Sequence, residues 1–189
     1  PAKYQNMNEL TAVVIGATGL TGSLVLQELL KDETFKTVRV LVRRNVNMIH
    51  PKLEQEIVNF NDLDDYSKKF GEGDVIFSCI GTTQKKVKGD KILYENIDFG
   101  IPVNAARIGI SKNFKKFLII SAIGANENSS NFYLKLKGKT EIQETIEVNL
   151  ADLIDVKGMK AMGNRVSAHV VKSVALIAEH DDEQDVPDP

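Results

Sequence analysis

The chain has 189 residues, of which 42% are hydrophobic and 26% charged, and its net charge is −2 at pH 7. This length fits a single domain, residues 1–189, around one buried core, and the balanced charge excludes the bulk basicity typical of nucleic-acid binding. No run reaches the roughly 18 apolar residues needed to cross a bilayer, so we expect neither membrane nor nucleic-acid partners.

Strand-like and helix-like segments alternate along the chain. Residues 1–9 are polar and carry no apolar signal segment, which predicts a cytoplasmic protein. The alternation beyond them is typical of a parallel sheet with helices on both faces, a doubly wound three-layer α/β/α architecture. The predicted strands are 12–15, 37–42, 56–59, 74–79 and 116–121, and the predicted helices are 20–31, 63–70, 91–108 and 131–148.

The first predicted strand runs directly into three glycines at three-residue spacing, Gly16, Gly19 and Gly22. A strand that feeds a helix through such a turn leaves the first N–H groups of the helix unpaired, where they can hold a pyrophosphate. Gly16 would allow a tight turn, Gly19 a close approach to phosphate, and Gly22 close packing of helix on strand. Any strand and helix can be joined by a glycine-rich loop, but this position favours a dinucleotide site in a Rossmann fold.

The second predicted strand ends in Arg43 and Arg44, without a carboxylate. An acidic residue here would bind the ribose of NAD, whereas a guanidinium can pair with the 2′-phosphate of NADP or stack on adenine. The alternative is that both arginines are only solvated surface charges. We expect NADP(H) as the cofactor, with NAD less favoured and Arg43 the first candidate. Asp62, after the third predicted strand, can be a helix N-cap, a partner of the adenine amine, or both.

The fourth predicted strand contains Cys79 and is followed by Gly81 and Thr82, at the carboxyl edge where ligands bind in such sheets. A small residue there lets a ribose lie against the backbone. The basic loop 84–88 is interpreted as a solvated loop, or alternatively as a cover for phosphates. Cys79 is expected in the core; as the sole cysteine it excludes an intrachain disulfide and favours a reducing compartment.

Candidate chemistry lies in Ser121 and in the pair Tyr133 and Lys137. Residues four apart share a helix face, so this tyrosine and lysine would point the same way. The ammonium would lower the pKa of the phenol and bind the cofactor ribose, which leaves the tyrosine able to move the proton that accompanies hydride transfer. Ser121, which ends the fifth predicted strand, would bond to the substrate carbonyl.

The order of these motifs resembles the short-chain dehydrogenase/reductase superfamily in its extended or atypical branch, over roughly residues 10–149. Within it, residues 16–22, 79–83 and 129–138 look most like the Tat-interacting-protein oxidoreductase-like group, which binds NADPH. The resemblance implies catalytic roles for Ser121, Tyr133, Lys137 and, as a helix asparagine, Asn96, which can instead bond locally or hold a relay water. The expected cofactor contacts are Gly16, Thr18, Gly19, Leu20, Thr21, Gly22, Arg43, Arg44, Asp62, Leu63, Ile80, Gly81, Thr82, Ser121, Tyr133 and Lys137.

The sequence departs from this group after residue 149, because no Arg-Pro-Gly segment or substrate-binding extension follows. Residues 151–156 could be a sixth strand, and the apolar run 166–178 resembles a last helix, with His169 inside it and His180 at its end. The substrate lobe after about residue 150 is therefore expected to be short or incomplete. The spacing of Cys and His residues predicts no metal site.

Two functions follow from these patterns. The first is an NADP(H)-dependent oxidoreductase acting on a small carbonyl or alcohol, whose identity the sequence does not specify. The second is a sensor that binds NADPH without turnover and controls a partner protein, with a homodimer as a further option. Sugar-nucleotide epimerisation would need a larger substrate lobe.

Overall fold

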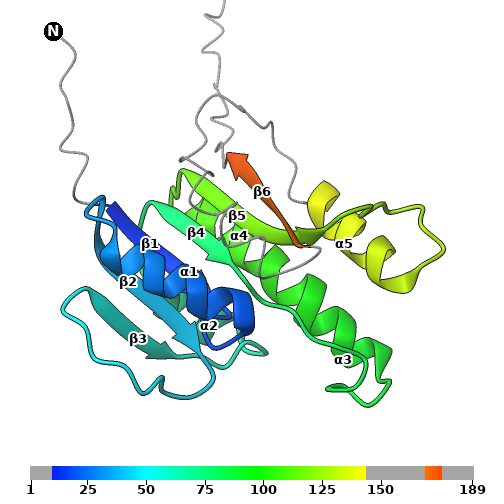
Figure 1. Cartoon of the computed structure of the whole chain (residues 1–189), viewed down its shortest axis with the longest axis horizontal. Helices are drawn as coiled ribbons and strands as arrows, with labels where there is room; N and C mark the ends of the chain where they lie inside the picture. The colour runs from blue at the N-terminus through cyan, green and yellow to red at the C-terminus, as the bar shows by residue number, and fades with distance from the viewer. Residues whose placement is uncertain (1–9, 144–168, 176–189) are drawn as a thin grey trace, which may run out of the picture.

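The computed structural model describes residues 10–143 and 169–175. These residues form a six-stranded sheet flanked by helices (Figure 1). The strands are β1 Leu10–Ile15, β2 Phe35–Val42, β3 Leu53–Ile57, β4 Val75–Ser78, β5 Lys116–Ala122 and β6 His169–Ala175. The helices are α1 Leu20–Lys31, α2 Leu63–Phe70, α3 Lys91–Glu95, α4 Ile101–Ser111 and α5 Phe132–Gln143, with a π-helical turn, η1, at Asn96–Gly100 between α3 and α4.

The strand order is β3-β2-β1-β4-β5-β6, and the first five strands are parallel to their neighbours. The order reverses at β1, whose Ile15 pairs with Leu41 of β2 on one side and Ser78 of β4 on the other. This is the doubly wound arrangement that the alternating pattern predicts, and its switch point is where such sheets bind ligands.

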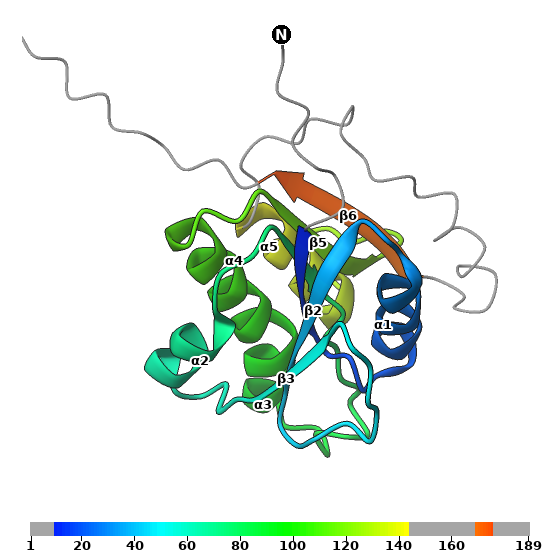
Figure 2. The ribbon, with the colours of Figure 1, turned by 90° about the vertical axis from the view of Figure 1, so that its left-hand side faces the viewer.

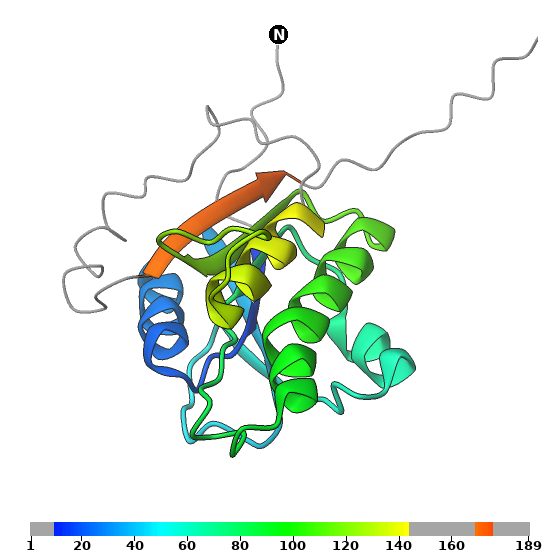
Figure 3. The same cartoon turned by 90° about the vertical axis from the view of Figure 1, so that its right-hand side faces the viewer.

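Helices cover both faces of this parallel sheet, so its central strands are apolar on both sides. On one face Leu26 of α1 packs with Val14 and Val38; on the other Tyr66 of α2 packs with Val13. Figure 2 shows α1 on one side of the sheet and α2 and α4 on the opposite side. α5 lies beside α4 and contacts β5 and η1 (Figure 3). The core thus fixes the ends of β1, β2 and β4 side by side.

The predicted helix 91–108 is wrong as a single element, because three segments replace it. α3 ends at Glu95, η1 follows, and α4 runs to Ser111. Pro102 lies in the first turn of α4 and has no N–H to donate to residue 98, so the regular hydrogen-bond ladder is interrupted there. A π-helical turn accommodates this irregularity.

The helix predicted over residues 166–178 is also wrong. Residues 169–175, beginning with His169, form β6, which is antiparallel to β5 and pairs Val170 with Ser121. Valine favours strands, and the edge of β5 offers hydrogen-bond partners that an apolar run of ambiguous period can use. The sixth strand predicted at 151–156, residues 144–148 of the predicted last helix, and His180 lie outside the described residues.

Candidate functional site

The glycine turn closes tightly on the end of β4. Gly16 has φ +83°, and a Cβ there would lie 2.7 Å from the Cys79 carbonyl carbon, so this position requires glycine. A Cβ on Gly22 would overlap the Gly16 carbonyl group, because α1 packs directly on the turn. Gly19 is the N-cap of α1 without a side-chain hydrogen bond, and the first turn contains no acidic residue. The N–H groups at this helix end are therefore available to an anion.

A cavity of about 480 Å³ opens beside this turn, at the carboxyl ends of β1, β2 and β4. Its lining includes the glycine turn and residues 79–82, and its cations are Arg43, Arg44 and Lys86. Phe60 and Ile97 contribute apolar surface, which the sequence did not predict. The predicted cofactor contacts that line this cavity are Gly16, Thr18, Gly19, Arg43, Arg44, Ile80, Gly81 and Thr82.

The other predicted contacts lie elsewhere. Leu20 and Leu63 are exposed side chains at the starts of α1 and α2, and neither lines the cavity. Thr21 and Gly22 lie in the first turn of α1 behind the glycine turn, and Gly22 serves packing. Burial raises the pKa of the Cys79 thiol, which does line the cavity, to about 12, so this cysteine stays a protonated packing residue.

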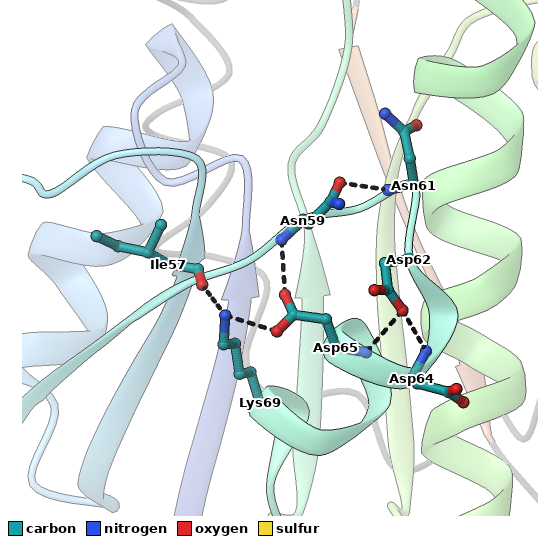
Figure 4. A network of polar contacts seen from close by, with 7 residues as sticks. All are labelled: Ile57, Asn59, Asn61, Asp62, Asp64, Asp65 and Lys69. Carbon is teal, nitrogen blue, oxygen red and sulfur yellow. Dashed lines mark hydrogen bonds and ion pairs between the residues drawn. The ribbon is translucent and has the colours of Figure 1, made fainter.

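Asp62 caps α2, as Figure 4 shows. Its carboxylate accepts hydrogen bonds from the backbone N–H groups of Asp64 at 3.0 Å and Asp65 at 3.1 Å. The Asp65 carboxylate accepts from the Asn59 N–H at 2.8 Å and pairs with Lys69 at 2.7 Å, and its hydrogen bond with Lys69 lowers the pKa of Asp65. This network fixes the connection from β3 to α2. Asp62 does not line the cavity, so its adenine contact stays a prediction.

Tyr133 and Lys137 share a face of α5, as their spacing predicts. The Lys137 ammonium lies 6.0 Å from the centre of the Tyr133 ring, and Tyr133 packs in a cluster with Val87 and Ile97, which line the cavity. The ammonium is paired with Asp98 of η1 at 3.2 Å, and both side chains are buried. Asp98 therefore joins the predicted pair, and the three ionisable side chains Tyr133, Lys137 and Asp98 form one group next to the cavity.

The expected effect of Lys137 on the phenol is wrong in this structure. Burial, followed by the charge of Asp98, raises the pKa of Tyr133 above its ordinary value. The ammonium does not lower it because Asp98 supplies a counter-charge 3.2 Å away. The phenol is therefore protonated at neutral pH.

Ser121 and Asn96 do not join this group. Ser121 is buried at the end of β5, where its hydroxyl donates a hydrogen bond to the Glu141 carboxylate of α5. Asn96 is exposed at the first position of η1. The residue of this segment that reaches Lys137 is Asp98, two positions later.

Asp98 is the main residue that sequence reasoning missed. A signal was present, because Tyr94, Asp98 and Ile101 follow each other at spacings of four and three, which place a carboxylate on an apolar helix face. Its acceptance of the Thr82 N–H depends on the approach of η1 to the loop after β4, between residues 16 positions apart. The sequence around either residue does not predict this contact.

Within residues 10–143 and 169–175 no three His, Cys, Asp or Glu side chains gather as a metal site. In the same part of the chain, every helix is too short or too polar to cross a membrane.

Residues 16–152 match the family described as NAD(P)H-binding. Protein HTATIP2 of Rattus norvegicus is 32% identical over 138 residues, which cover 71% of this chain and 56% of that protein. Protein FMP52, mitochondrial, of Meyerozyma guilliermondii is 30% identical over 161 residues, or 85% of this chain and 68% of that protein. The chain therefore spans little more than half of the rat protein and about two thirds of the yeast protein.

Solved structures show the same fold. The X-ray structure of Pen from Bacillus thuringiensis superposes with a TM-score of 0.61 and 18% identity, over 73% of this chain and 45% of that one. The Bordetella bronchiseptica enzyme WbmF in complex with NAD⁺ gives a TM-score of 0.59, with the same identity and coverage. Together with the two relatives, the matched family confirms the resemblance drawn from the motifs: this chain belongs to the NAD(P)H-binding family and has a Rossmann fold.

Proposed function

We propose that this protein is an NADP(H)-dependent oxidoreductase that acts on a small carbonyl or alcohol substrate. The observation that carries the proposal is the cavity at the switch point, where the glycine turn and two arginines meet. Tyr133 and Lys137 do not line this cavity but lie behind its residues Val87 and Thr82, the latter through Asp98. The hydrogen-bond donors of the cavity suit the phosphate groups of a dinucleotide. A Cβ on Gly16 would collide with the β4 end, the helix N–H groups suit a pyrophosphate, and Arg43 suits a 2′-phosphate.

Each group has one task in this proposal. The bound nicotinamide would supply or accept the hydride. Arg43 and Arg44 would hold the adenosine 2′-phosphate, and the N–H groups at the start of α1 the pyrophosphate. Tyr133 would donate a proton to the oxygen of a carbonyl substrate in the reducing direction and accept it back in the oxidising direction. The phenol holds this proton at neutral pH, since burial and Asp98 raise its pKa above its ordinary value, so it is present as the donor that the reducing direction needs.

Turnover tests this proposal directly. The purified chain is mixed with NADPH and a panel of aldehydes and ketones, and the nicotinamide absorbance is followed. Tyr133→Phe keeps the ring that packs beside Val87, so it should bind NADPH normally and lose turnover by about 100-fold or more. Tyr66→Phe, which removes a hydroxyl from α2 outside the cavity, is the matched control. An unchanged rate for Tyr133→Phe would exclude the proton-transfer role.

A specific contact favours the second candidate, an NADPH-binding sensor without turnover. The Ser121 hydroxyl is engaged with Glu141, so it is not free to bind a substrate carbonyl in this arrangement. In this alternative the bound nucleotide would act on a partner protein or a second copy of the chain. Tight NADPH binding without oxidation of any substrate, together with nucleotide-dependent dimerisation in sedimentation experiments, would favour it over the enzyme.

The compartment is also a proposal. We propose the cytoplasm, whereas FMP52 relatives carry the word mitochondrial in their names. Fractionation of the tagged full-length protein from its native cells distinguishes the two.

A further inference from the structure

One buried carboxylate links the cavity edge to helix α5. Asp98 is 1% exposed, and its Oδ2 accepts the backbone N–H of Thr82, a cavity-lining residue, at 2.8 Å. Its Oδ1 lies 3.2 Å from the Lys137 ammonium, an ion pair without the angular geometry of a full hydrogen bond. Three segments that are distant in sequence therefore meet at one side chain.

Lys137 needs this counter-charge. Its side chain is 4% exposed, and a buried ammonium is strongly unfavourable unless it is paired. Four flexible methylene groups separate the ammonium from the helix, so helix geometry alone does not fix its position. The Asp98 carboxylate does fix it, because the π-helical turn and the Thr82 N–H hold that carboxylate in place.

The corner around Thr82 is itself held from two sides. The Tyr94 hydroxyl donates a hydrogen bond to the Thr82 carbonyl oxygen at 3.2 Å, while the Thr82 N–H is bound to Asp98. The Tyr94 ring packs edge-on against Phe132 of α5, with ring centres 5.4 Å apart. Both backbone groups of Thr82 thus depend on side chains that also contact α5 or its ion pair.

We propose that Asp98 is a positioning residue whose carboxylate clamps the Lys137 ammonium to the Thr82 corner of the cavity and sets its relation to Tyr133. The ionisable groups around Tyr133 are Asp98 of η1, Lys137 of α5 and Tyr94 of α3. While Asp98 and Lys137 are paired, the ammonium has its counter-charge, and the Asp98 carboxylate raises the pKa of Tyr133. Without the carboxylate charge, the ammonium alone would act on Tyr133 and favour its phenolate. A catalytic role for this clamp rests on the proposed function, but the contact between Asp98 and Lys137 can be tested in protein without cofactor.

Asp98→Asn tests the clamp, because the amide oxygen can still accept the Thr82 N–H while the negative charge is lost. The readout is the pH titration of the Tyr133 ring carbon in protein labelled with ¹³C-tyrosine, assigned with Tyr133→Phe. We expect the Tyr133 midpoint to fall by about one pH unit or more, and the fall to vanish in Asp98→Asn/Lys137→Met. Tyr66, whose hydroxyl is 3.4 Å from the Ile101 carbonyl oxygen, is the internal control. An unchanged Tyr133 midpoint in folded Asp98→Asn would overturn the proposal.

A second measurement needs no substitution. In protein labelled with ¹⁵N-lysine, the Lys137 ammonium resonance should move with the same midpoint as the Asp98 carboxyl carbon, because the two charges are in contact. Lys135 and Lys139 are exposed on the same helix and should not follow it. A Lys137 resonance that ignores Asp98 would overturn the clamp, even if Asp98→Asn fails to fold. Failure of NADPH binding would instead remove the proposed function and leave both titrations valid.

Discussion

The cavity at the glycine turn and the cluster around Lys137 are adjacent, but they are built in different ways. The cavity is lined by the glycine turn, by apolar residues such as Phe60 and by exposed cations such as Arg43. The cluster consists of buried side chains that satisfy one another, such as Lys137 and Asp98. The cavity is therefore ready for a ligand without rearrangement of its turn, whereas a ligand at the cluster competes with existing partners. In the proposed function, cofactor binding would depend on the shape of the glycine turn and the chemistry on the paired charges.

The largest expected effect is on the cluster. Lys137→Met leaves Asp98 buried without its partner, and breaking a buried pair in this way costs about 3–5 kcal/mol of unfolding free energy at pH 7. Burial already raises the pKa of Asp98 above 3.8, and losing the ammonium raises it further. A raised carboxyl pKa contributes stability below pH 3.8 that is lost as the pH rises through the folded-state value. Lys137→Met should therefore lose less unfolding free energy at pH 4 than at pH 7.

Urea unfolding at both pH values measures this difference. Lys135→Met removes an exposed ammonium from the same helix and should leave stability nearly unchanged at either pH. Equal losses for Lys137→Met at pH 4 and pH 7 would show that packing, not the uncompensated charge of Asp98, explains the effect.

The next effect is on the backbone of the cavity. Gly16→Ala combines a φ of +83° with a Cβ 2.7 Å from the Cys79 carbonyl carbon, so we expect a loss of about 3 kcal/mol and weaker NADPH binding. Gly89→Ala is the matched control, because its φ is +82° and no atom lies within 4 Å of the added Cβ. It should cost about 1 kcal/mol. If both variants lose the same stability, the contact between the turn and β4 does not matter.

A smaller effect tests the exposed cations. Arg43→Ala should weaken NADPH binding about 10-fold to 100-fold and NADH binding much less, because only NADPH carries the 2′-phosphate. Arg107→Ala removes an exposed arginine of α4 that does not line the cavity, and it should affect neither nucleotide. Calorimetric titration of both nucleotides measures the ratio. Equal weakening of NADPH and NADH would remove the phosphate assignment of Arg43.

The smallest effect concerns Asp62, next to but outside the cavity. Asp62→Ala removes the acceptor for two N–H groups of α2 and should cost about 1 kcal/mol in thermal or urea unfolding. Asp62→Asn keeps an acceptor oxygen and should stay close to the parent protein. If Asp62→Ala and Asp62→Asn had the same stability, this would contradict the capping role that Figure 4 shows.

Sequence pattern predicts the first half of the fold well and the second half less well. The bounds predicted for α1 and α2 coincide with the observed ones, since a glycine turn and an aspartate cap mark where these helices begin. The five parallel strands follow from alternation with helices. The π-helical turn was not predicted because the helical pattern continues across Pro102, and β6 was not predicted because a short valine-rich run has no decisive period.

The same division applies to the site. Glycine spacing and arginines at a strand end are local, so the glycine turn and the cations of the cavity could be predicted from the sequence, whereas its apolar residues Phe60 and Ile97 could not. The partners of Ser121 and Lys137 are Glu141 and Asp98, and these pairings depend on how α5 lies against β5 and η1. Local spacing places Tyr133 and Lys137 on one face but contains no information on which carboxylate meets them.

The most direct test of this account is a calorimetric titration of the purified protein with NADPH and then with NADH. A preformed backbone cavity predicts one NADPH bound per chain, with NADPH at least about 10-fold tighter than NADH. Absence of binding by either nucleotide would contradict the central claim that the glycine turn and its cavity hold the cofactor.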